Sequence, residues 1–223
     1  MVRVRWFHAE WPIAIRTLAA RMRLQLFTDS TQDGFLLERT RENSIEGRFV
    51  EKLAYQETFP DPFGQELTFE RVVYRQVQFS IYRDFPQLEL RDAPRNVQTF
   101  ISKLLALTDF SMTVAPLKTD VMQWAEALKL ALDKAIIMDT VQVSAITIAP
   151  DITGAMLLKS RRDVKKAMSE VVAGRTHSVD KARLSWTDDG TPISVQLGCG
   201  GSSKLEFEAI NLLPALRASL PKP

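Results

Sequence analysis

A strand of alternating character followed by an amphipathic helix, between Glu66 and Leu107, most constrains what this chain can fold into. Apolar side chains recur at every second position, as in a strand with one buried face. They are Val73, Val77, Phe79 and Ile81, and the polar or aromatic side chains between or beside them are Tyr74, Gln76, Gln78, Ser80 and Tyr82. Asp84-Phe85-Pro86 then predicts a turn, because proline cannot donate to a ladder, and residues 87–91 predict a second strand.

The helix of this stretch is predicted to begin near Pro94, because proline suits the first turn of a helix. Apolar residues follow at three- and four-residue spacing, namely Val97, Phe100, Ile101, Leu104 and Leu105. This spacing places them along one stripe of a helix. The apolar stripe and the apolar strand face can bury each other, which indicates an α+β core.

The rest of the chain extends the α+β pattern. We predict a mostly antiparallel sheet of about seven to nine strands, covered by three main helices. The other two helices are expected at 120–134, whose apolar stripe contains Trp124, and at 160–174, where Ser160 and Asp163 have capping-box spacing.

The order of these elements bears on domain organisation. Strands precede the helix in residues 1–107, and helices precede the last strands in residues 108–223. This leaves two arrangements open: two similar sheet-plus-helix halves that meet near residues 108–118, or one continuous domain.

The composition is that of an ordinary globular protein, with 223 residues of which 45% are hydrophobic and 25% charged. The single cysteine, Cys199, excludes an intrachain disulfide and a cysteine-based zinc cluster, which favours a reducing compartment. No run reaches the roughly 18 apolar residues of a membrane-spanning helix. The N-terminal residues also lack the apolar core of a signal peptide. We therefore expect a cytoplasmic protein without a membrane segment and without a cofactor.

The charge of the chain is distributed unevenly, although the formal net charge is only +2. Residues 1–26 carry five arginines against one glutamate, and residues 159–183 carry eight lysines and arginines against three acids. The remainder of the chain is acidic. Two basic regions on an acidic body indicate surfaces for phosphate groups or for an acidic protein partner.

The second basic region predicts a helix with a cationic face. Lys159, Arg161, Arg162, Lys165 and Lys166 occupy the positions left when the apolar stripe of residues 164–172 faces the core. The helix macrodipole opposes cations at a helix N-terminus, so a reason other than helix stability favours them there. Contacts with phosphates, contacts with an acidic partner and a merely solvated helix face all remain open. In the first basic region, Arg3 and Arg5 alternate with apolar residues, as in a strand.

The polar face of the central strand is a further candidate surface. Tyr74 and Tyr82, with the glutamines between them, resemble a platform on which single-stranded nucleic acid stacks. The same pattern is typical of a sheet face that a partner subunit or a helix covers.

A short motif is similar to the pattern of the PD-(D/E)xK nucleases. Pro60-Asp61 is followed by Glu89-Leu90-Arg91, and the resemblance implies that Asp61 and Glu89 hold a metal ion for phosphodiester cleavage. The motif departs from the family at Arg91, which stands in place of lysine and cannot lose a proton.

We therefore predict a non-catalytic binding or adaptor protein. It contacts a protein partner, nucleic acid or both, through the basic helix and the arginine-rich N-terminal strand. A metal-dependent nuclease is the alternative. A nuclease requires Asp61 and Glu89 to converge in a cleft, whereas a binding protein requires a continuous exposed basic or aromatic surface. The sequence leaves the oligomeric state open.

Overall fold

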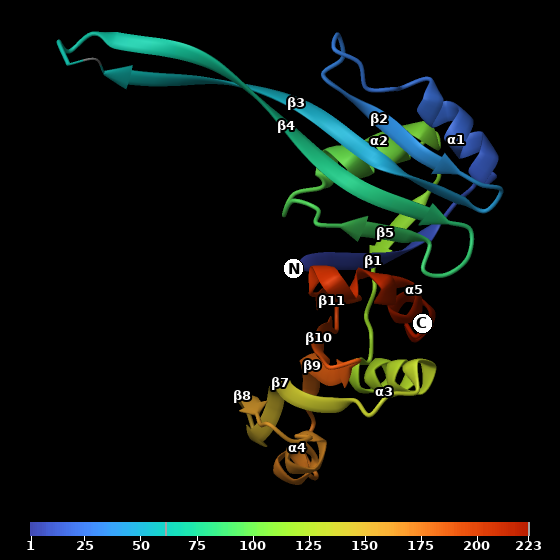
Figure 1. The fold of residues 1–223 in the computed structure, drawn as a ribbon, viewed down its shortest axis with the longest axis vertical. Helices are drawn as coiled ribbons and strands as arrows, with labels where there is room; N and C mark the ends of the chain where they lie inside the picture. The colour runs from blue at the N-terminus through green and yellow to red at the C-terminus, as the bar shows by residue number, and fades with distance from the viewer. Residues whose placement is uncertain (61, 223) are drawn as a thin grey trace. The chain divides into compact units, whose positions relative to one another are not determined.

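The computed structural model describes residues 1–60 and 62–222 of the chain (Figure 1). Within them, eleven strands make up 47% of the structure, and helical segments, including five short α-helices, make up 23%. The prediction of three main helices on a sheet of seven to nine strands is therefore wrong. No helix in the described residues has the length and apolar composition needed to cross a lipid bilayer.

Strands and short helices are interspersed along the chain. The strands are β1 (Val2–Glu10), β2 (Asp33–Thr40), β3 (Ser44–Pro60), β4 (Glu66–Tyr82), β5 (Leu88–Arg91), β6 (Thr113–Pro116), β7 (Ile137–Ala149), β8 (Ile152–Lys159), β9 (Ser178–Asp188), β10 (Thr191–Gly198) and β11 (Ser202–Leu205). The α-helices are α1 (Ile15–Arg23), α2 (Gln98–Leu107), α3 (Val121–Leu132), α4 (Lys165–Val172) and α5 (Leu213–Ala218), and a 3₁₀ helix, η1, covers Phe207–Leu212.

The chain divides into two compact units. One, the hairpin unit, is Ala9–Val114, and the other, the C-terminal unit, combines Met1–His8 with Ala115–Pro223. The hairpin unit has the sequential strand order β2-β3-β4-β5, whereas the C-terminal unit has the order β1-β11-β10-β9-β7-β8. These orders differ, so the expectation of two similar halves is not supported.

The hairpin unit is built around the pairing of β3 with β4, which runs from Ser44 opposite Tyr82 to Pro60 opposite Glu66. Only the first part of this hairpin belongs to the four-stranded sheet, because β2 pairs with β3 as far as Glu51 and β5 pairs with β4 only at residues 78–81. The remainder, residues 52–60 and 66–74, continues as a two-stranded ribbon, cyan to teal in Figure 1. We call this ribbon the arm.

The core of the hairpin unit confirms the predicted alternation of the central strand only in part, because Val73 is half-buried and Ser80, on the predicted polar face, is 2% exposed. Val77, Phe79 and Ile81 are at most 1% exposed. The ring of Phe100 on α2 lies 5.2 Å from that of Phe79 and 5.7 Å from that of Phe49 on β3. The helix and the apolar sheet face thus bury each other, as the sequence predicts. However, α2 begins at Gln98 and not near Pro94, and of the predicted stripe only Phe100 and Leu104 are fully buried.

The C-terminal unit is held together by α3. Asp120 caps this helix, since its carboxylate accepts hydrogen bonds from the backbone N–H groups of Met122 and Gln123. Trp124 is fully buried, with its ring 5.7 Å from that of Trp6 and nearly perpendicular to it. Its Nε1 donates to the carbonyl of Leu216 (3.1 Å) and to the Ser219 hydroxyl (3.2 Å). The predicted central position of this helix is confirmed.

One strand of the C-terminal unit was not predicted. β7, which contains the apolar run 141–148, turns at Asp151, whose φ is 61°, into a further strand, β8. The burial pattern of β8 alternates only between exposed and half-buried side chains. It is the edge strand of the sheet, so its sequence lacks the apolar alternation of a strand with one buried face.

The basic helix begins at Lys165 and not at Ser160. Asp163 accepts hydrogen bonds from the backbone N–H groups of Met138 on β7 (3.2 Å) and of Lys165 (2.8 Å), and the N–H of Val164 donates to the carbonyl of Met138. These bonds hold the preceding loop against β7. The predicted stripe is buried at Val164, Met168 and Val172, whereas Ala167 and Val171 are exposed.

Candidate functional site

The register of the C-terminal sheet places basic residues from four strands in one transverse row. From strand to strand, Arg3 lies opposite Lys204, Lys204 opposite Gln196, Gln196 opposite Arg183, Arg183 opposite Thr140, and Thr140 opposite Lys159. Neighbouring strands lie about 4.8 Å apart, so this row crosses roughly 24 Å of the sheet.

A second row lies two residues along the same strands. It consists of Arg5, Ser202, Gly198, Lys181, Gln142 and Leu157, each opposite the next. Residues two apart in a strand share a face, so both rows lie on one face of the sheet. We call this surface the basic face, and its cations are Arg3, Arg5, Lys159, Lys181, Arg183 and Lys204.

The basic face is the exposed side of the sheet. All six cations are exposed, and none of the twelve residues in the two rows is aromatic. The residues that alternate with them, such as Val4, Ala182 and Leu197, are at most 1% exposed and form the core. The basic face is therefore the solvent side of the sheet that α3 and the core pack against.

Carboxylates are sparse on the basic face. Among the described residues, no carboxylate lies within ion-pair distance of Lys159, Lys181 or Lys204. The guanidinium of Arg5 lies over the ring of Phe7, 5.6 Å from its centroid, an arrangement that holds the side chain without neutralising it. At the margin of the face, Glu206 is within 3.4 Å of the Ser194 hydroxyl.

Arg183 differs from these lysines because it has a carboxylate partner. Its Nε donates to Oδ1 of Asp139 at 2.7 Å. Burial of Asp139 opposes ionisation, but hydrogen bonds from Arg183, Thr140 and Ser185 outweigh it and lower the pKa of this carboxyl below its ordinary value. Asp139 therefore stays ionised and offsets one positive charge of the face.

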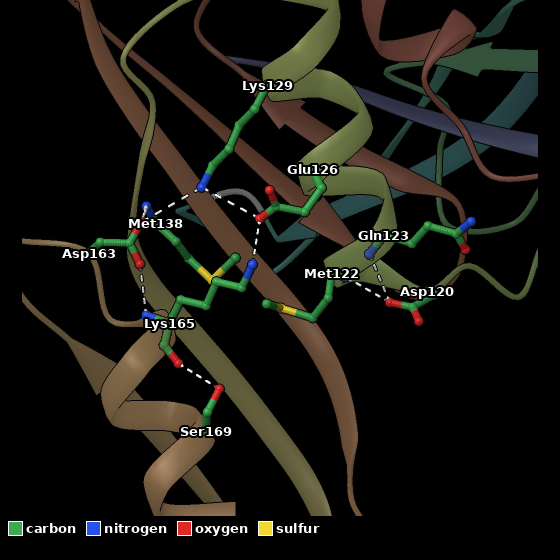
Figure 2. Close-up of polar contacts among 9 residues, drawn as sticks. All are labelled: Asp120, Met122, Gln123, Glu126, Lys129, Met138, Asp163, Lys165 and Ser169. Atoms are coloured by element: carbon green, nitrogen blue, oxygen red, sulfur yellow. Dashed lines mark hydrogen bonds and ion pairs between the residues drawn. The ribbon is translucent and has the colours of Figure 1, made fainter.

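The predicted basic helix is only partly a cationic surface. Lys159 lies at the end of β8, Arg161 and Arg162 lie in the following loop, and Lys165 and Lys166 lie in the first turn of α4. Figure 2 shows that Nζ of Lys165 reaches across to the carboxylate of Glu126 on α3, at 2.9 Å.

This contact belongs to a small network between α3 and the start of α4. Lys129 lies 3.7 Å from carboxylate oxygens of both Glu126 and Asp163 (Figure 2). The hydrogen bond from Lys165 is the main cause that lowers the pKa of Glu126. Lys165 therefore has a structural partner, whereas no described carboxylate lies within ion-pair distance of Arg161, Arg162 or Lys166.

The predicted stacking platform lies in the hairpin unit. Tyr74 is 52% exposed, and its ring meets that of Phe27 edge-on at 6.0 Å. Tyr82 is half-buried, and its carbonyl accepts a hydrogen bond from the indole of Trp11. Four arginines of this sheet each have a glutamate within ion-pair distance: Arg48 with Glu38, Arg71 with Glu57, Arg75 with Glu51, and Arg91 with Glu89.

The described residues include only one carboxylate of the nuclease-like motif, Glu89. Asp61 lies outside the described residues, but Pro60 before it pairs with Glu66, whereas Glu89 pairs with Ser80. These partners lie fourteen residues apart on β4, or roughly 47 Å at about 3.4 Å per residue. Glu89 is 2% exposed and accepts a hydrogen bond from Arg91 at 2.7 Å. No group of three potential metal ligands occurs within residues 1–60 and 62–222.

Sequence reasoning identified Arg3, Arg5 and Lys159 but missed Lys181, Arg183 and Lys204 as part of one surface. A local signal exists for Lys181 and Arg183, which alternate with buried Ala182 and Leu184. Their position beside the N-terminal strand depends on the strand order, which composition and spacing do not reveal.

The chain was compared with models of known protein families and with the sequences of characterised proteins, and neither comparison gives a match.

Proposed function

We propose that this protein is a non-catalytic binding protein that holds the sugar-phosphate backbone of nucleic acid on the basic face. The observation that carries the proposal is the transverse row in which Arg3, Lys204, Arg183 and Lys159 follow one another across six strands. Lysine and arginine neutralise phosphates and release condensed counterions, which supplies most of the free energy of non-specific binding.

The chemistry of the basic face favours phosphates over bases. Its two rows contain no aromatic side chain on which a base can stack. The residues between the cations are small or carry amides and hydroxyls, such as Gln196 and Ser202, which donate hydrogen bonds to phosphate or sugar oxygens. The row of roughly 24 Å corresponds to about seven phosphates of one duplex strand at ~3.4 Å each. We therefore propose a duplex, bound with little sequence preference.

Arg161, Arg162 and Lys166 continue the positive charge from the end of β8, so the basic segment and the N-terminal strand serve the same ligand in this proposal. We place this activity in the cytoplasm, because the lone cysteine, which is free and exposed, fits a reducing compartment. A protein partner remains part of the proposed adaptor role.

A charge-reversal experiment tests the proposal. The protein with Lys181→Glu and Lys204→Glu is titrated against a labelled mixed-sequence DNA duplex at low salt, and fluorescence anisotropy reports binding. We expect affinity to fall by about tenfold or more, since two phosphate contacts are lost and two repulsive charges are added. Both side chains are exposed, so the melting temperature should change little.

The matched control reverses two cations of the hairpin unit, Arg48→Glu and Lys103→Glu, which changes the net charge by the same amount. Both cations are ion-paired in the structure. This control should bind nearly as tightly as the wild type. The proposal is wrong if the wild type binds no duplex at low salt, or if both double variants bind equally well.

A further inference from the structure

The arm of the hairpin unit carries an apolar face that the fold leaves uncovered. Its opposed pairs on this face are Phe59 with Leu67, Glu57 with Phe69, Tyr55 with Arg71, and Leu53 with Val73. They have the same parity as Phe49 and Val77, a pair that is buried in the core. The face is therefore a continuation of the core face of the sheet, beyond the reach of the helices that cover it.

The exposure of this face is substantial. Tyr55, Phe59, Leu67 and Phe69 are 46%, 53%, 46% and 57% exposed. A large apolar side chain has roughly 200 Å² of surface, so these four expose on the order of 400 Å² in one strip. This is about the size of the largest apolar patch on a typical monomeric protein, and such patches are often functional.

The charge of the arm favours a protein occupant over nucleic acid. Its described residues include three glutamates, Glu57, Glu66 and Glu70, against Lys52 and Arg71. An acidic ribbon repels a phosphate backbone. The arm and the basic face are therefore suited to different partners.

The apolar face is complementary to itself. Its one acid and one base, Glu57 and Arg71, lie in adjacent rows and are 3.0 Å apart, with their side chains 40% and 63% exposed. Apolar pairs flank them on both sides along the arm. When two copies of this face meet, each Glu57 can therefore lie against Arg71 of the other copy, and apolar pairs can lie against apolar pairs. An isologous contact requires this kind of self-complementarity.

We propose that the arms of two copies of this chain pack face to face and form a twofold dimer. Each Glu57 then contacts Arg71 of the other copy, and the four large apolar side chains of each arm interdigitate as in two packed sheets. The four side chains of both copies contribute about 800 Å² of buried surface, less than the 1,200–2,000 Å² of a standard interface. The dimer should therefore be concentration-dependent. This proposal does not depend on nucleic-acid binding.

The test uses sedimentation of the full chain across a micromolar concentration series. The wild type should shift from monomer to dimer. Glu57→Arg gives the face two positive charges and Arg71→Glu gives it two negative charges, so each variant alone should dimerise about tenfold more weakly or worse. An equimolar mixture of the two variants should recover the dimer, because their faces are then complementary. If each substitution acted only by breaking the ion pair within its own chain, mixing the two variants would not restore the dimer.

Apolar variants supply a second, matched comparison. Phe69→Ala removes an aromatic from the proposed interface, whereas Val72→Ala shortens a side chain that is 40% exposed on the opposite face of the arm. We expect Phe69→Ala to weaken the dimer and Val72→Ala to leave it unchanged. A wild type that stays monomeric throughout, a mixture that does not recover, or a dimer that tolerates Phe69→Ala would each overturn the proposal.

Discussion

The sheets of the two units differ in whether their cationic side chains have carboxylate partners. In the hairpin unit, Arg48, Arg71, Arg75 and Arg91 each lie within 4.0 Å of a glutamate. On the basic face of the C-terminal unit, Arg183 has such a partner, but no described carboxylate comes as close to Lys159, Lys181 or Lys204. The formal charge is −2 over residues 9–114 and +4 over the rest of the chain.

In the proposed function, this difference separates cations that form ion pairs within the fold from cations that contact a ligand. Like charges opposite one another on a sheet are destabilising, as Arg3 and Lys204 are in the first row. In the proposed complex, a bound polyanion would offset this repulsion on the basic face. The number of arginines in a sequence segment is therefore a weaker indication of a binding surface than cations that lack a nearby carboxylate in the folded structure.

The largest expected effect is on stability, from a substitution in α3, the helix that packs behind the basic face. Trp124→Ala removes a fully buried indole and two hydrogen bonds from the core behind this face. We expect the free energy of unfolding to fall by about 3–5 kcal/mol, and duplex binding to be lost with the fold. Denaturant unfolding measures the change. A near-neutral result would show that α3 does not hold this sheet.

A smaller effect is expected from the one acid that faces Arg183. Asp139→Asn removes the carboxylate, so the basic face gains one net positive charge and duplex affinity should rise about twofold to fivefold at low salt. The lost charge-assisted hydrogen bond should cost about 1–2 kcal/mol of stability. Anisotropy and denaturant unfolding measure the two quantities. Weaker binding by this variant would contradict the assigned role of the acid.

The same carboxyl predicts a dependence of stability on pH. Because hydrogen bonds lower the pKa of folded Asp139 below the ordinary value of 3.8, its contribution is fully present above about pH 3.8. It is lost as the pH falls from there through the lower pKa of the folded state. Melting temperatures between pH 5 and pH 2 should fall more steeply for the wild type than for Asp139→Asn. Parallel curves would show that this carboxyl has the same pKa in both states.

The smallest effect is expected from removing an acid of the hairpin unit. Glu38→Gln leaves Arg48 without its ion-pair partner, yet the pair is about half exposed and contributes only ~0–1 kcal/mol to stability. Duplex affinity should change less than it does for Asp139→Asn, because Arg91, which lies two strands away in the same row as Arg48, is itself paired with Glu89. An equal or larger gain would show that any unpaired arginine suffices and that the register of the basic face is irrelevant.

The apolar pattern within a single segment was enough to predict the elements that bury one regular apolar face. The alternation that buries Phe79 and the spacing that buries Trp124 are both visible in single segments. The edge strand β8 was missed because its exposed side chains remove that alternation. The start of α4 was misplaced because it depends on hydrogen bonds with Met138 on β7, whose N–H donates to Asp163 and whose carbonyl accepts from Val164.

The candidate site was less accessible to sequence reasoning than the fold. Arg3 and Lys204 are about two hundred residues apart in the chain and become neighbours only through the pairing of β1 with β11. Lys165 was predicted to be part of the cationic surface, but Glu126 on α3 pairs with it. The pairing of Arg3 with Lys204 and the ion pair of Lys165 with Glu126 both depend on which elements lie side by side. The amino-acid pattern of one segment does not show this.

The salt dependence of duplex binding tests the central claim most directly. If the cations of the basic face contact phosphates, the logarithm of the association constant should fall linearly with the logarithm of salt concentration, with a slope of about −4.5 to −5.4 for five or six contacts. Lys181→Gln should reduce the magnitude of that slope by about 0.9, whereas Arg48→Gln should leave it unchanged. A slope near zero, or a slope that Lys181→Gln does not alter, would contradict the account.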